Sequence, residues 1–161
     1  MDFDERLTRA IERGERRGDE RSREARAREL SEDELKRLHT QYRLQLSEHI
    51  DDCLKRLPNH FPGFRTETIF GERGWGVACF RDDLRLGPGG KRGTDYSRLE
   101  MTIRPPSAYQ ILELTAKGTI RNKEVFNRSH FDRLAEVDVE KFLELIDLWV
   151  LEYAELYAAK K

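Results

Sequence analysis

Residues 98–104 read RLEMTIR, and this stretch decides the fold because apolar and polar side chains alternate along it. Leu99, Met101 and Ile103 fall on one face of an extended strand, and the charged and hydroxyl side chains between them fall on the other. This pattern is typical of an antiparallel strand that is covered on one face and exposed to water on the other. We therefore expect a sheet with one open face.

Short runs rich in threonine, β-branched and aromatic residues lie on both sides of this stretch, as strands require. They are FRTETIF at 64–70, WGVACFR at 75–81, YQILELTA at 109–116 and TIRNKEVF at 119–126. The glycine-bearing connection at 71–74 predicts one hairpin, and Lys117-Gly118 predicts the turn of a second. The runs together predict about five antiparallel strands that follow one another in chain order.

Two helices are expected to cover one face of this sheet. The first has a capping box at Ser31 and Glu34 and an apolar stripe over about 32–57, and Pro58 ends it. The second begins after the N-cap Asp138 and carries a broad apolar stripe. The predicted fold is an α+β two-layer sandwich: a meander sheet of about five strands, with an N-terminal and a C-terminal helix packed on one face.

The first thirty residues have a different composition from the rest of the chain. They hold nine arginines, nine acidic residues and few large apolar side chains, so they cannot form a core of their own. Opposite charges three or four residues apart favour a helix, whereas Gly14 and Gly18 oppose it. We expect a charged helical or disordered arm at 1–30, followed by a single α+β domain at 31–161.

The charge balance excludes a general attraction to polyanions. The 161 residues include 30 basic and 31 acidic side chains, which gives a net charge of -1, so neither nucleic acid nor an anionic membrane attracts the whole chain. The sequence lacks a run of 18 apolar residues and the apolar core of a signal peptide. No membrane association is expected, and a cytoplasmic location is predicted.

The arm carries the first candidate binding surface. Phe3, Leu7 and Ile11 recur every four residues, which is the spacing by which a short amphipathic helix docks on a partner. The alternative interpretation is a frayed terminus, or an arm folded against its own body or against a symmetry mate. A protein partner or a second copy of the chain is the expected ligand of this surface.

A glycine-rich basic loop at 87–93 is the second candidate. Glycines expose backbone N–H groups, and Lys91 and Arg92 add two cations that suit an anion. Arg98 and Arg104 would extend the surface along the open sheet face. The spacing is not that of a phosphate-binding Walker loop, and a long mobile hairpin loop, the favoured interpretation, explains the segment without a function. Anion or nucleic-acid binding is therefore an alternative function.

Metal and cofactor binding are not predicted. His49 and Cys53 are four residues apart on the first predicted helix, and His39 and His60 lie nearby in sequence. Two ligands do not make a structural zinc site, which normally needs four, so packing on the apolar face is expected for His49 and Cys53. Cys53 and Cys79 lack a Cys-x-x-Cys pairing, so both cysteines are expected to be reduced.

The sequence contains no recognisable catalytic constellation. Asp95, Glu100, Glu113 and His130 are candidate acids or bases, but nothing in the sequence brings them together. A small-ligand or enzyme site between sheet and helices, using Glu113 or His130, is therefore a second alternative. The sequence favours a non-enzymatic interaction domain, adaptor-like or chaperone-like, that uses its arm and its open sheet face.

Overall fold

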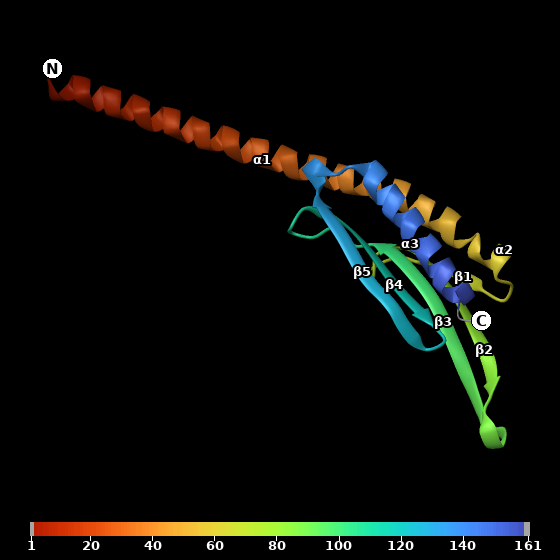
Figure 1. Ribbon diagram of the computed structural model, residues 1–161. Helices are drawn as coiled ribbons and strands as arrows, with labels where there is room; N and C mark the ends of the chain where they lie inside the picture. The colour runs from red at the N-terminus through yellow and green to blue at the C-terminus, as the bar shows by residue number, and fades with distance from the viewer. Residues whose placement is uncertain (1, 160–161) are drawn as a thin grey trace. The chain divides into compact units, whose positions relative to one another are not determined.

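The computed structural model describes residues 2–159, apart from the side chains of residues 27–30. The chain divides into two compact units, Met1–Arg37 and Leu38–Lys161, which we call the arm and the body. The elements are α1 (Phe3–Leu54), α2 (Leu57–His60), β1 (Arg65–Ile69), β2 (Trp75–Leu86), η1 (Pro88–Gly90), β3 (Arg92–Ile103), β4 (Ile111–Ile120), β5 (Lys123–Arg133), η2 (Leu134–Glu136) and α3 (Val139–Ala159). Figure 1 labels the α-helices and the strands. The first part of α1 forms the arm, and its last part belongs to the body.

The body contains a single five-stranded sheet with the order β1-β2-β3-β4-β5, and each neighbouring pair is antiparallel. This meander confirms the predicted topology. Leu99, Met101 and Ile103 are fully buried on one face of β3, whereas Arg98 and Glu100 on the other face remain partly exposed. The alternation that predicted a sheet covered on one side is therefore present.

Both predicted helices lie on the covered face of the sheet (Figure 1). The last part of α1 buries Leu46, Ile50 and Leu54. On α3 the buried side chains are Phe142, Ile146, Trp149, Val150, Tyr153 and Tyr157. The Tyr153 hydroxyl donates a hydrogen bond to the Thr119 carbonyl oxygen at 2.8 Å, which ties α3 to β4. The α+β two-layer sandwich is thus confirmed.

The predicted start of the first helix is wrong, because α1 runs without a break from Phe3 to Leu54. Its N-terminal cap is formed by Asp2, whose Oδ1 accepts a hydrogen bond from the Glu5 N–H at 2.9 Å. Ser31 therefore lies inside the helix rather than at its beginning. The opposite charges of the arm allow the helix to continue toward the N-terminus.

The predicted end of this helix also differs from the structure. Helix α1 ends at Leu54, and Pro58 lies in the first turn of the separate short helix α2. Proline is tolerated at that position because the first N–H groups of a helix have no partner within the helix. Pro58 therefore lies in the first turn of a helix instead of ending one.

The second hairpin turns at a different place from the one predicted. Strand β4 continues through Lys117-Gly118 to Ile120, and the turn is formed by Arg121 and Asn122. Both turn residues have positive φ, 47° and 71°, as a two-residue type I′ hairpin turn requires. Gly118 has another role, because a Cβ there would come within 2.9 Å of the Phe126 ring. It allows that ring to pack on β4.

None of the helices in the described part of the chain has both the length and the apolar character needed to cross a bilayer.

Candidate functional site

The arm presents a row of exposed apolar side chains on one face of its helix. All side chains from residue 2 to residue 26 are exposed, and Phe3, Leu7 and Ile11 are 72%, 47% and 54% exposed. At about 100° per residue, these three side chains share one face of α1, and Gly14 and Gly18 continue the same face. We call these five positions the arm stripe. A Cβ added at either glycine would meet nothing within 4 Å.

The two edges of the arm stripe carry opposite charges between residues 3 and 18. On a helical projection Asp4 and Glu15 lie along one edge. Arg6, Arg13 and Arg17 lie along the other edge. The stripe is therefore bordered by an acidic side and a basic side.

The residues of the predicted anion site are spread along β3 and are not brought together. Lys91 and Arg92 lie at the tip of the β2–β3 hairpin, and Arg104 follows the opposite end of the strand. Twelve residues of extended chain separate these ends by roughly 40 Å. Arg104 Nε lies 4.0 Å from Glu113 Oε1, so its charge is partly balanced by an acid.

Arg98, at the middle of the open sheet face, is surrounded by acidic and aromatic partners. Its guanidinium lies 2.9 Å from Glu67 and 3.4 Å from Glu100, and it also donates a hydrogen bond to the Tyr96 hydroxyl. Arg73 lies 2.6 Å from Glu100. Because these cations already have acidic partners, they offer less attraction to an external anion.

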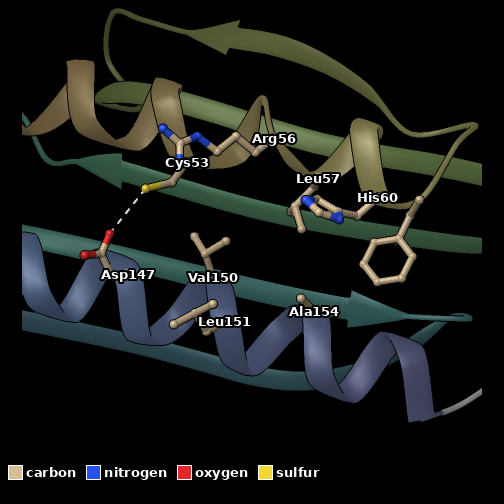
Figure 2. A pocket seen from close by; sticks show the side chains of 9 residues that line it. Cys53, Arg56, Leu57, His60, Asp147, Val150, Leu151 and Ala154 are labelled. Carbon is tan, nitrogen blue, oxygen red and sulfur yellow. Dashed lines mark hydrogen bonds between the residues drawn. The ribbon is translucent and has the colours of Figure 1, made fainter.

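The body contains a groove between the end of α1, α2 and α3 (Figure 2). Its volume is about 590 Å³, and it is lined by Cys53, Arg56, Leu57, His60, Phe61, Asp147, Val150, Leu151 and Ala154. On the α3 side the lining residues are aliphatic, apart from Asp147. Arg56 and His60 line the opposite side, formed by the end of α1 and by α2. This groove lies between helices, whereas the sequence predicted a site between sheet and helices.

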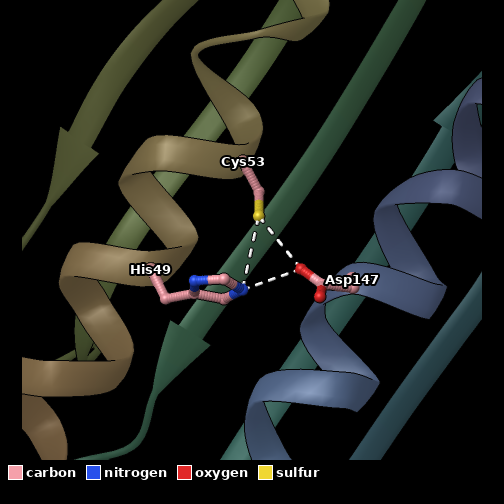
Figure 3. A group of neighbouring side chains, drawn as sticks. All are labelled: His49, Cys53 and Asp147. Atoms are coloured by element: carbon pink, nitrogen blue, oxygen red, sulfur yellow. Dashed lines mark hydrogen bonds and ion pairs between the residues drawn. The ribbon is translucent and has the colours of Figure 1, made fainter.

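Three potential metal ligands meet at one end of the groove (Figure 3). His49 and Cys53 project from successive turns of α1, and Asp147 faces them from α3. His49 Nε2 lies 2.7 Å from Asp147 Oδ1, and Cys53 Sγ lies 3.6 Å from His49 Nε2 and 3.4 Å from Asp147 Oδ1. We call these three residues the His-Cys-Asp cluster.

The environment of Cys53 keeps its thiol protonated at neutral pH. Burial raises the pKa of Cys53 to about 11, and the hydrogen bond to Asp147 and the negative charge of its carboxylate contribute to this rise. The same imidazole nitrogen, Nε2, faces both the thiol and the carboxylate. In a catalytic triad the imidazole lies between its two partners and uses both ring nitrogens. The cluster therefore lacks the geometry of an activated cysteine nucleophile.

The other two histidines near α1 are outside this cluster. His39 is buried, and its Nε2 lies 3.2 Å from the Arg104 carbonyl oxygen. Burial lowers the pKa of His39, so the neutral ring donates this hydrogen bond at neutral pH. His60 is exposed at the far end of the groove. The sequence named His49 and Cys53 as a pair, but it gave no signal for Asp147, which lies 94 residues after Cys53.

The candidate acids and bases are distributed over different parts of the body. Asp95 lies 3.4 Å from Arg85 near the hairpin tip, and Glu100 lies on the open sheet face. Glu113 lines a separate hollow beside the 105–110 loop. His130 packs edge-on against Phe142 with 4.9 Å between ring centres. The fold thus does not join these four side chains into one site.

Comparison of the chain with protein-family models, with curated proteins and with solved structures finds no match.

Proposed function

We propose that this protein is a non-enzymatic interaction protein that assembles with a second copy of itself through the arm stripe. The observation that carries the proposal is the exposure of Phe3, Leu7 and Ile11 on one face of a continuous helix. A helix that is exposed on all sides gains no stability from tertiary packing. Gly14 and Gly18 oppose helix formation by about 1 kcal/mol each relative to alanine. Burial of the stripe against another helix offsets that cost.

The pattern of the stripe favours a parallel pair of helices. In parallel alignment each apolar side chain meets its own counterpart, and the glycines let the two backbones approach closely. The acidic edge of one helix then faces the basic edge of the other, whereas antiparallel pairing of this segment brings like edges together. Asp4 and Glu15 thereby lie beside the arginines of the second copy. The arm stripe is thus complementary to itself.

Sedimentation equilibrium of the full chain tests this proposal. We expect the wild type to reach twice the mass of one chain at micromolar concentrations. Ile11→Gln removes one apolar side chain from each copy, and burial of an isoleucine contributes about 1.5–3 kcal/mol. The dimer dissociation constant should therefore rise at least about 100-fold.

The neighbouring variant Glu12→Gln is the matched control, since it introduces the same side chain about 100° further around the helix, outside the arm stripe. Its dissociation constant should stay within about threefold of the wild-type value. A chain that remains monomeric at about 100 μM contradicts the proposal, because that concentration lies well above the micromolar range in which the dimer is expected. Equal dimer stability in Ile11→Gln and the wild type contradicts it as well.

A further inference from the structure

We propose that His49, Cys53 and Asp147 bind a divalent transition-metal ion of the Zn²⁺ type, with a fourth coordination position open to the groove. The three side chains offer an imidazole nitrogen, a thiolate sulfur and a carboxylate oxygen, and their ligand atoms all lie within 4.8 Å of one another. This inference is independent of the assembly through the arm stripe, because the cluster lies entirely in the body.

The distances within the cluster are close to those around a tetrahedral ion. Zn²⁺ with bonds of about 2.3 Å to sulfur and about 2.0 Å to nitrogen and oxygen places the sulfur about 3.5 Å from the other two ligand atoms. Cys53 Sγ lies 3.6 Å from His49 Nε2 and 3.4 Å from Asp147 Oδ1. The nitrogen and the oxygen, now 2.7 Å apart, need to separate by only about 0.6 Å to fit the ion.

The two helices hold these ligands on a rigid framework. His49 and Cys53 are four residues apart, so they lie one above the other on the same side of α1. Ile50 and Leu54, the residues that follow them, are fully buried in the core. Asp147 follows the buried Ile146 on α3. Because both helices are anchored in the core, the cluster needs little rearrangement to bind an ion.

The donor set points to the chemical class of the ion. Thiolate and imidazole ligands suit Zn²⁺ and related transition metals, whereas Ca²⁺ and Mg²⁺ take oxygen ligands. On binding, the ion forms bonds to sulfur, nitrogen and oxygen, and the thiol proton of Cys53 passes to solvent. Three protein ligands leave one position of a tetrahedral ion for water or an anion. Cys53 and Asp147 also line the groove, so this position faces it.

Titration of the reduced full-length protein with Co²⁺ tests the inference, because a cysteine-bound cobalt ion has a thiolate charge-transfer band. We expect this band to saturate at one ion per chain. Cys53→Ser should abolish it and weaken Zn²⁺ binding, measured by competition, at least about 100-fold. Mutation of a residue that only hydrogen-bonds to a metal ligand already lowers metal affinity about 10–100-fold, and loss of a ligand itself should have at least that effect. Asp147→Asn should also weaken binding.

Cys79→Ala is the matched control, because Cys79 is fully buried in the sheet and lies outside the cluster. This variant should retain the band and the affinity. Zn²⁺ should also raise the thermal midpoint of the wild type and leave that of Cys53→Ser unchanged, by mass action on the folded state. The inference is overturned by a wild type without the band, by a band that persists in Cys53→Ser, or by one that is lost in Cys79→Ala.

Discussion

Gly76→Ala is expected to destabilise the body by at least about 3 kcal/mol, because the new methyl group has no space. A Cβ at Gly76 would lie 1.9 Å from the Met101 carbonyl oxygen and 2.8 Å from the Met101 carbonyl carbon. These are backbone atoms of β3, so no side-chain rotation can remove the overlap. The paired strands at the centre of the sheet would have to separate.

Urea unfolding followed by circular dichroism measures this loss, and Gly87→Ala serves as the control. Gly87 has an extended backbone with φ of -94°, and the nearest atom to an added Cβ, the Lys91 carbonyl oxygen, is 3.4 Å away. The free energy of unfolding of Gly87→Ala should differ from that of the wild type by less than about 0.5 kcal/mol. Equal stability of the two variants would show that β2 and β3 are not packed as described.

Phe142→Ala is the second substitution with a large expected effect, about 3–5 kcal/mol of stability. Phe142 is fully buried on α3, and its ring packs edge-on against His130 of β5. Removal of the ring leaves a cavity between the helix layer and the sheet. This variant therefore tests whether α3 covers the sheet.

The same measurement on Phe131→Ala provides the comparison, since Phe131 is 58% exposed and adjacent to His130 in sequence. Loss of the Phe131 ring should change the free energy of unfolding by less than about 0.5 kcal/mol. A similar cost for both phenylalanine substitutions would contradict the burial of α3 on this face of the sheet.

The layers of the body could be predicted from the sequence because each one has its own hydrophobic period. In RLEMTIR, apolar and polar side chains alternate with a period of two. The predicted C-terminal helix is α3, and Asp138 caps its start as expected. The boundaries were less predictable. Ser31 and Glu34 have the spacing of a capping box, yet charge pairs carry the helix through them. Lys117-Gly118 has turn composition, but the ring of Phe126 requires that glycine within β4.

Only some residues of the candidate sites could be recognised from the sequence. Phe3, Leu7 and Ile11 could be recognised because they are local in the chain, and so could the pair His49 and Cys53. Asp147 could not be recognised, because its proximity to Cys53 depends on the packing of α1 beside α3. Local spacing indicates residues on one helix, whereas contacts between distant segments are determined by the tertiary fold.

Disulfide cross-linking through the arm stripe tests the central claim most directly. In a parallel pair of helices position 7 faces its own counterpart, so Leu7→Cys should form a covalent dimer under mild oxidation. Arg9→Cys, about 200° further around the helix, and the wild type should remain uncross-linked. The account predicts a dimer on non-reducing electrophoresis for Leu7→Cys alone. Cross-linking of both variants to the same extent, or of neither, would contradict assembly through the arm stripe.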